Sequence, residues 1–238
     1  MTNSRKIEVC VTPFLLPLYD LSNAIVVVID IFRATSSICY GIANGAEAIV
    51  PVASVEACLA QKGSGCLLAA EREGKVVDGF DFGNSPFAYT TEKVAGKTIV
   101  LTTTNGTYAI DQSKSSAHQI IVGSFLNLQA VSDYLAQQDK DVLLLCAGWK
   151  NKFNLEDTLF AGAVIENLKD QGFELEDAGH AALDLYEKAK TDLIAYTAKA
   201  SHGKRMKGLH LEEDIRFCLQ LNQTSAIPVL NGDRLVKM

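Results

Sequence analysis

The sequence predicts an α/β protein built on a mainly parallel sheet that is flanked by helices. Strand-like runs of β-branched and aliphatic residues alternate with helix-like stretches along most of the 238 residues. The strand-like runs are continuously apolar rather than alternating, which is typical of parallel strands buried on both faces. Open parallel sheets bind ligands beyond the carboxyl ends of their strands, so functional residues are expected there.

Strands are expected at residues 24–30, 47–52, 66–70, 97–102, 119–122, 141–146 and 227–230, and helices at 36–43, 55–61, 107–113, 126–137 and 155–168. The last of these helices carries apolar residues at a spacing that gives one buried stripe. Residues 177–221 read as mostly helical. Residues 73–91 are rich in Gly, Asp, Asn, Ser and Pro, which predicts a long functional loop.

The length fits a single α/β domain, 1–238, and a weak boundary near Ser116 would allow two lobes, 1–116 and 117–238, around a cleft. The formal net charge of -6 argues against a nucleic-acid partner. No apolar run approaches the roughly 20 residues of a membrane helix, and the N-terminus lacks the apolar core of a signal peptide. We therefore expect a cytoplasmic protein with no membrane partner.

The cysteines and histidines show no metal-site spacing. The six cysteines form no CxxC pair and most sit in apolar runs, which indicates reduced, buried thiols. The four histidines form no HxH or HExxH motif, so a zinc site is not expected. His202 reads as a polar surface residue, and Lys204 and Arg205 read as part of an exposed charge run.

Two strand ends carry residues suited to phosphate. Asp30 ends the first strand, and although it could simply cap a helix, Arg33 three residues later favours an anion-binding role. After the fourth strand, Thr103, Thr104, Asn105 and Gly106 offer hydroxyl groups and a turn that opens a helix, where backbone N–H groups and the helix dipole attract phosphate.

Acidic residues stand near the other strand ends. They are Glu71, Asp81, Glu156 and Asp157, and they are accompanied by Arg72 and Ser124. The acids also have structural alternatives. Glu71 and Arg72 could be a surface pair, and Asp81 suits a turn. Glu156 and Asp157 suit the first turn of a helix, where Asp157 imitates a capping box with Asn154. Common phosphatase motifs are absent, because there is no P-loop, no Arg six residues after Cys146, and Phe32 stands where a DxD strand end requires a second acid.

These segments together closely resemble the 2-phosphosulfolactate phosphatase family. The matching stretches, in chain order, are VVVIDIFRAT, ANGAEAIVPV, AAEREG, GFDFGNSP, TTTNGT, VGSFLN, CAG and LEDTLFAGAVI. The similarity extends roughly from Asp30 to Leu168 and is weaker at 201–203, 213–218 and 227–228. The ordered set is far more specific than any one motif.

The resemblance implies the α/β fold of that family, Mg²⁺ dependence, and hydrolysis of 2-phospho-3-sulfolactate to 3-sulfolactate in coenzyme M biosynthesis. On this basis Mg²⁺ is expected on some of the acids Asp30, Glu71, Asp81, Glu156 and Asp157. Phosphate is expected on Arg33 and the 103–106 turn, with Ser124 nearby. Arg72, with Lys204 or Arg205, is expected to bind the sulfonate or carboxylate.

Three points stay open at this level. Asp30 could attack phosphorus itself, or a metal-activated water could do so. The substrate could be another small phospho-acid, or the chain could bind a phosphorylated metabolite as a sensor without turnover. A homodimer is expected only from the apolar surface that such α/β enzymes commonly carry.

Overall fold

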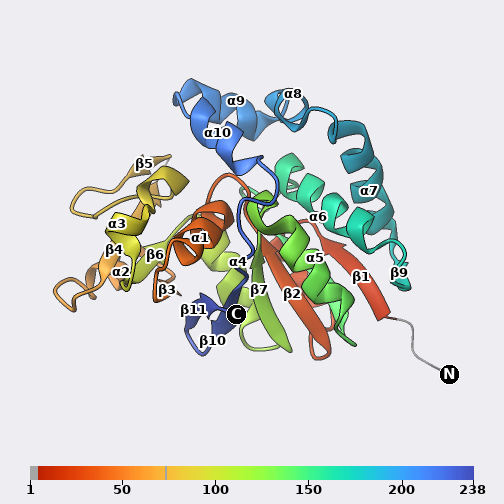
Figure 1. The fold of residues 1–238 in the computed structure, drawn as a ribbon, viewed down its shortest axis with the longest axis horizontal. Coiled ribbons are helices and arrows are strands. Elements are labelled where there is room, and N and C mark those ends of the chain that lie inside the picture. Colours follow the sequence, from red (N-terminus) through yellow and green to blue (C-terminus); the bar gives the residue numbers. More distant parts are fainter. Residues whose placement is uncertain (1–4, 73) are drawn as a thin grey trace.

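A computed structural model describes residues 5–72 and 74–238, and within these residues eleven strands form one sheet (Figure 1). The strand order is β5-β4-β6-β3-β11-β10-β7-β2-β8-β1-β9. The strands are β1 (Arg5–Cys10), β2 (Ala24–Ile29), β3 (Ala48–Pro51), β4 (Leu67–Arg72), β5 (Lys75–Val76), β6 (Thr98–Thr102), β7 (Gln119–Gly123), β8 (Asp141–Cys146), β9 (Phe173–Leu175), β10 (Pro228–Asn231) and β11 (Arg234–Lys237). The α/β fold class is confirmed.

The α-helices fall between strands and in the last third of the chain, as expected. They are α1 (Ala34–Ala43), α2 (Val55–Leu59), α3 (Thr91–Val94), α4 (Gly106–Ser113), α5 (Leu128–Ala136), α6 (Leu155–Leu168), α7 (Asp177–Ala189), α8 (Leu193–Ala198), α9 (Ser201–Gly208) and α10 (Glu212–Cys218). Short 3-10 helices are η1 (Pro13–Leu18), η2 (Pro86–Ala88) and η3 (Phe125–Asn127). The predicted loop at 73–91 therefore contains β5 and η2.

Both faces of the sheet are covered, because alternate residues of the central strand β2 enter two different cores. Ile25, Val27 and Ile29 pack in the core that includes α5 and α6, whereas Val26 and Val28 pack in the core that includes α1 and α4. All six residues of β2 are buried. This two-sided burial explains why the strand is continuously apolar.

Helices α6 and α7 pack closely because α6 has a glycine at their contact. A Cβ atom at Gly162 would lie 2.1 Å from the carbonyl oxygen of Ala182 in α7. Only glycine permits this approach of the two backbones. The close packing fixes α6, whose first turn carries Glu156 and Asp157.

The sheet is parallel except near its middle and at β5. The hairpin β10–β11 pairs antiparallel with β7 on one side and with β3 on the other, and it thereby joins two parallel groups of strands. β2 and β7, which lie on either side of Ser116 in the sequence, are adjacent parallel strands. A boundary near Ser116 would pass between neighbours in one sheet.

Helices α9 and α10 lie at the edge of the sheet where the central strands end, as Figure 1 shows. Side-chain contacts hold them there: His202 of α9 reaches Glu156 of α6, and Asp214 of α10 reaches Arg33 after β2. None of the helices in the described parts of the chain has the length and hydrophobicity that a membrane crossing requires.

Candidate active site

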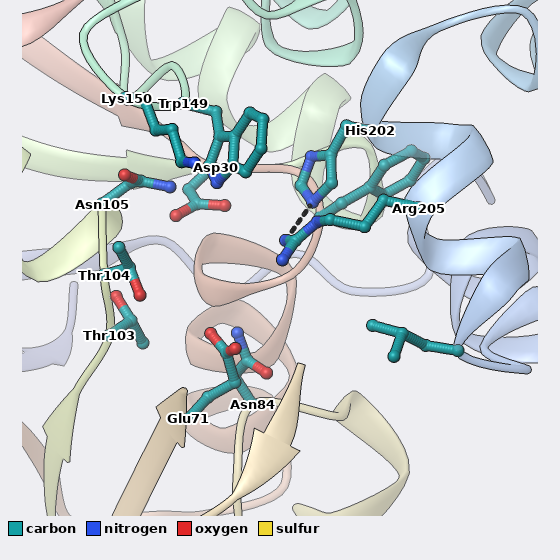
Figure 2. Close-up of a pocket in the computed structure, with 12 residues that line it drawn as sticks. Asp30, Glu71, Asn84, Thr103, Thr104, Asn105, Trp149, Lys150, His202 and Arg205 are labelled. Atoms are coloured by element: carbon teal, nitrogen blue, oxygen red, sulfur yellow. Dashed lines mark hydrogen bonds between the residues drawn. The ribbon is translucent and has the colours of Figure 1, made fainter. Parts of the chain in front are cut away.

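A pocket of about 390 Å³ opens at the carboxyl ends of β2, β4 and β6 (Figure 2). Residues from six separate segments line it. They are Asp30, Phe32, Glu71, Asn84, Thr103, Thr104, Asn105, Trp149, Lys150, His202, Arg205 and Leu209. Of the predicted site residues, the structure therefore brings together Asp30, Glu71, the 103–105 turn and Arg205. The location agrees with the rule for open parallel sheets.

Asp30 lies at the centre of this pocket, directly after β2. Its backbone is fixed by the first turn of α1, because its N–H donates to Thr35 Oγ1 at 3.0 Å and its carbonyl accepts the Thr35 N–H at 2.9 Å. The pKa of Asp30 is raised to about 6, because burial and the neighbouring Glu71 and Glu156 together outweigh the opposing effect of His202. A carboxyl group of this kind changes protonation near neutral pH, which suits acid–base or ligand chemistry.

The turn after β6 approaches Asp30 closely because it contains a glycine. A Cβ atom at Gly106 would lie 3.0 Å from Asp30 Oδ2 and 2.7 Å from the Cβ of Ala34. The predicted phosphate turn is therefore packed against the predicted catalytic carboxylate. Gly106 acts by leaving this space free.

The 103–105 turn is held in place by reciprocal hydrogen bonds. Thr103 N–H donates to Thr107 Oγ1 at 3.2 Å, Thr107 N–H donates to Thr103 Oγ1 at 3.2 Å, and the Thr107 hydroxyl donates to the Thr103 carbonyl at 2.9 Å. Thr104 and Asn105 then line the pocket at the start of α4. A rigid turn with exposed polar side chains at a helix start is suited to phosphate.

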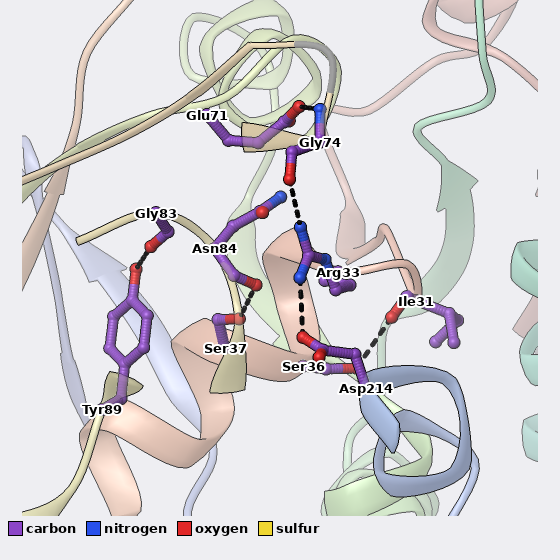
Figure 3. Close-up of polar contacts among 10 residues, drawn as sticks. All are labelled: Ile31, Arg33, Ser36, Ser37, Glu71, Gly74, Gly83, Asn84, Tyr89 and Asp214. Atoms are coloured by element: carbon purple, nitrogen blue, oxygen red, sulfur yellow. Dashed lines mark hydrogen bonds and ion pairs between the residues drawn. The ribbon is translucent and has the colours of Figure 1, made fainter. Parts of the chain in front are cut away.

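Arg33 lies beside the pocket rather than in it. Its guanidinium donates to Asp214 Oδ1 at 2.6 Å and to the carbonyl of Gly74 at 3.3 Å, and the Gly74 N–H donates in turn to the Glu71 carboxylate (Figure 3). This chain of contacts links α10, α1 and the β4–β5 turn, and it orients Glu71. Arg33 also borders an adjoining cavity of about 450 Å³. Its predicted contact with phosphate stays a prediction.

His202 is buried, which corrects its expected place on the surface. It is 6% exposed, its Nδ1 lies 2.5 Å from Glu156 Oε1, and its Nε2 lies 3.1 Å from the Arg205 guanidinium. Because a guanidinium only donates, Nε2 accepts and Nδ1 carries the proton that is donated to Glu156. The isolated position of His202 in the sequence hid this role, since its partner Glu156 lies 46 residues away.

Glu156 and Asp157 are both fully buried but differ in their partners. Asp157 accepts the Ile31 N–H at 2.9 Å and the Gly148 N–H at 3.2 Å, so it ties together the loops that follow β2 and β8. Burial, Glu156 and Asp30 raise the pKa of Asp157 well above its usual value. Glu156 uses Oε1 for His202, while its buried Oε2 has no hydrogen-bond partner among the described residues. Neither acid lines the pocket surface.

Three other predicted residues do not line this pocket. Ser124 is fully buried and caps η3 together with Asn127. Arg72 donates to the carbonyl of Glu71 at 2.7 Å and to Thr102 Oγ1 at 3.5 Å. Asp81 is exposed and accepts the Leu68 N–H at 2.7 Å, facing the adjoining cavity.

A tight turn after β8 supplies two pocket residues that the sequence did not reveal. Trp149 and Lys152 exchange backbone hydrogen bonds of 3.1 Å, and Lys150 and Asn151 between them have φ values of 53° and 56°. The turn presents Trp149 and Lys150 to the pocket, as Figure 2 shows. Positive φ at both central residues is typical of hairpin turns, although a Lys-Asn pair is a weaker signal than Asn-Gly.

The carboxylates fit a hard cation such as Mg²⁺. Among the described residues no group of three or more His, Cys, Asp or Glu side chains forms a metal site by itself. Mg²⁺ commonly needs only one or two carboxylates, with waters and substrate phosphate completing its shell. Asp30 lines the pocket, and Glu156, which raises the pKa of Asp30, has a buried Oε2 with no hydrogen-bond partner among the described residues. An unpaired buried carboxylate oxygen is costly unless it has such a partner.

Known proteins of one family are similar to most of this chain. A family model described as 2-phosphosulpholactate phosphatase matches residues 10–233. A protein of Thermotoga maritima, named as a probable 2-phosphosulfolactate phosphatase, is 43% identical over 212 residues, covering 89% of this chain and 91% of its own. Relatives with the same name in Caldanaerobacter subterraneus and Clostridium acetobutylicum are 40% and 37% identical, each covering 90% of this chain and, respectively, 90% and 93% of their own.

Proposed function

The chain belongs to the 2-phosphosulpholactate phosphatase family and is a phosphoric monoester hydrolase, and from this premise we propose that the pocket around Asp30 hydrolyses 2-phospho-3-sulfolactate with the help of Mg²⁺. The observation that carries the proposal is the meeting of a buried carboxylate with a rigid threonine turn at the carboxyl ends of β2 and β6. Carboxylates attract the cation, and the turn accommodates the phosphate.

We propose that Asp30 and Glu156 hold the metal, with Glu71 close to the same space. Bound Mg²⁺ would neutralise charge on the phosphate and lower the pKa of a coordinated water. Asp30 is the acid on the pocket wall, and Glu156 Oε2 has no other partner among the described residues. Asp157 is better suited to holding the loops, because both of its oxygens accept backbone N–H groups.

The residues of the chain then orient the phosphoester. Thr103, Thr104 and Asn105 would hydrogen-bond to the phosphate oxygens, and the Arg33–Gly74–Glu71 chain would keep Glu71 in position. In hydrolysis an oxygen nucleophile bonds to phosphorus, the ester P–O bond breaks, and the sulfolactate oxygen takes up a proton. Holding the reacting groups in line supplies much of the rate enhancement.

Two roles of Asp30 fit this arrangement. As nucleophile it would form an aspartyl-phosphate, and as ligand it would hold the cation while water attacks. Rapid quenching after mixing with ³²P-labelled substrate separates the two, since acid-stable label on the chain is expected only for the nucleophile. Asp30→Asn is expected to abolish turnover in both cases, and an active Asp30→Asn variant would exclude both.

The proposal is tested by phosphate release from 2-phospho-3-sulfolactate in a metal-free preparation. Release is expected to require added Mg²⁺ and to stop with EDTA. Full activity in EDTA, with no metal detected in the protein, would contradict the Mg²⁺ proposal while leaving the phosphatase assignment intact.

The cellular setting is also proposed. We propose a cytoplasmic enzyme without a nucleic-acid partner, which the formal charge of -6 supports. We further propose a homodimer, and the strongly exposed Phe14 and Leu18 on η1 are suited to such a contact. Light scattering of the purified chain at micromolar concentration tests the dimer, and a monomer mass would exclude it.

A further inference from the structure

The wall of the pocket formed by Trp149 carries two positive charges. Lys150 Nζ lies 4.6 Å and Arg205 Cζ 5.1 Å from the centroid of the Trp149 ring. Lys150 belongs to the turn after β8, and Arg205 belongs to α9. Two separate parts of the chain thus bring a cation to the same ring.

Neither charge has a carboxylate partner within residues 5–72 and 74–238, the part of the chain that the structure describes. The buried Nε of Arg205 has no hydrogen-bond partner in the same residues. By contrast, Arg33 beside the pocket is paired with Asp214 at 2.6 Å. Two like charges on one ring repel each other, and a bound anion would relieve that repulsion.

Arg205 is held ready for such an anion. Its guanidinium donates to His202 Nε2 at 3.1 Å, and His202 in turn contacts Glu156 and packs at a steep angle to the Phe32 ring, with the two ring centroids 5.9 Å apart. The hydrogen bond uses NH2 and leaves the Nε–H without a partner. Planar guanidinium donors match carboxylate and sulfonate oxygens well.

Arg205 lies apart from the turn that would bind phosphate, whereas Lys150 is drawn beside Asn105 of that turn (Figure 2). Figure 2 shows Arg205 across the pocket from Thr104 and Asn105, with Asp30 between them. A substrate with a phosphate at one end and another anionic group at the other could touch both walls. The position of Arg205 therefore suits the tail of the substrate rather than the group that is transferred.

We propose that Arg205 and Lys150, arranged around Trp149, bind the second anionic group of the substrate and thereby select phosphoesters with a charged tail. The inference rests on the proposed function and names what determines its specificity. Of the three basic residues expected to bind the sulfonate or carboxylate, only Arg205 lines the pocket. Lys204 is exposed and borders a different cavity of about 310 Å³, and Arg72 does not line the pocket.

Kinetics with three phosphoesters test the proposal. The substrates are 2-phospho-3-sulfolactate, phosphoglycolate and glycerol 1-phosphate, whose tails carry two, one and no charges. Arg205→Gln and Lys150→Gln are expected to raise KM for the first substrate by about 10- to 100-fold, the worth of one charge-assisted hydrogen bond. For glycerol 1-phosphate, the kcat/KM of the same variants is expected to fall far less than for 2-phospho-3-sulfolactate. Lys204→Gln is the matched control and is expected to behave as wild type on all three substrates.

A binding measurement gives a second readout that needs no turnover. Trp149 is the only tryptophan of the chain, so its fluorescence reports on this wall directly. Titration with 3-sulfolactate is expected to change the emission of the wild type and of Lys204→Gln, and to do so only at much higher concentration in Arg205→Gln and Lys150→Gln. Lys150 is exposed in a surface turn, so its variant tests the proposal without disturbing the core.

The outcomes distinguish this inference from the proposed function. Equal losses on charged-tail and uncharged-tail substrates, or sulfolactate affinity unchanged in both variants, would overturn the tail-binding role. A wild-type enzyme that releases no phosphate from any of the three esters with Mg²⁺ would instead contradict the proposed function. The fluorescence titration still decides the tail-binding role in that case.

Discussion

His202 Nδ1 lies 2.5 Å from Glu156 Oε1, and this contact connects α9 to the first turn of α6. The contact attaches α9, which carries Arg205, to Glu156, whose Oε2 has no hydrogen-bond partner among the described residues. One hydrogen-bonded pair therefore joins the proposed metal site to the proposed tail-binding wall. A change in Glu156 is expected to affect the cation directly and the tail through His202.

Replacing Glu156 by Gln is expected to raise the Mg²⁺ concentration for half-maximal activity by about 10- to 100-fold, because the amide supplies no negative charge. The thermal midpoint is expected to change little, since removing a buried charge relieves its desolvation cost. Glu166→Gln, at the other end of the same helix, is the control and is expected to leave the Mg²⁺ requirement unchanged. An unaltered Mg²⁺ titration in Glu156→Gln would remove Glu156 from the metal site.

Replacing Gly106 by Ala is expected to lower kcat by about 100-fold. The new methyl group would lie 3.0 Å from Asp30 Oδ2 and would push this carboxylate out of its reacting position. Unfolding free energy is expected to fall by about 1–3 kcal/mol from the contact with Ala34. Gly208→Ala is the matched control, since no atom lies within 4 Å of its added Cβ. If Gly106→Ala keeps full kcat, the turn after β6 does not constrain the reacting carboxylate.

Replacing Asp214 by Ala is expected to lower the unfolding free energy by about 3–5 kcal/mol, because Arg33 would be left as an unpaired buried charge. The side chains of Arg33 and Asp214 are only 5% and 10% exposed. Urea denaturation measures the loss. Asp233→Ala breaks a surface pair with Lys114, in which Asp233 is 85% exposed, and is expected to cost less than about 1 kcal/mol. Equal losses of unfolding free energy in the two variants would show that the buried pair stabilises the protein no more than the surface pair does.

The thiols give a prediction for alkaline pH. Burial raises the pKa of Cys10 and of Cys58 to about 11, and that of Cys39 and of Cys218 to about 12, from a usual value of 9.0. Thiols in the unfolded chain lose their protons at a lower pH than the buried thiols of the folded protein. The contribution of the buried thiols to the unfolding free energy is therefore fully present below pH 9.0, and it is expected to be lost as the pH rises through 11. Urea midpoints measured from pH 8 to 11 check this, and a constant midpoint would contradict it.

The same burial predicts slow labelling by thiol reagents at pH 8. Cys66 is the partly exposed cysteine, whereas the other five free thiols are buried. We expect Cys66 to react rapidly in the native protein and all six cysteines to react after denaturation. Rapid native labelling of Cys39 or Cys218 would contradict the burial.

The strands at the centre of the sheet were predictable because burial on both faces leaves a continuous apolar run. β2, β6 and β8 carry this signal plainly. β1 does not, because its half-buried sequence RKIEVC alternates charged and apolar residues, and it was missed. β11 was missed because its sequence RLVK has only two apolar residues between charged ones, although Asn231-Gly232 before it is a hairpin signal.

Site residues were predictable where they follow a recognisable strand. Asp30, Glu71 and Thr103 stand directly after strands or at their ends, so the topology rule located them. Arg205 and Lys150 lie on a helix and a turn whose positions depend on tertiary contacts, such as the one between His202 and Glu156. No local pattern in the sequence encodes those contacts.

The hairpin β10–β11 occupies the middle of the sheet although it is made from residues 228–237, near the end of this sequence. During synthesis, the edges of β3 and β7 that pair with this hairpin stay unpaired until its residues leave the ribosome. Until then these two strand edges are open to edge-to-edge association, and a strand-binding chaperone would have a target there.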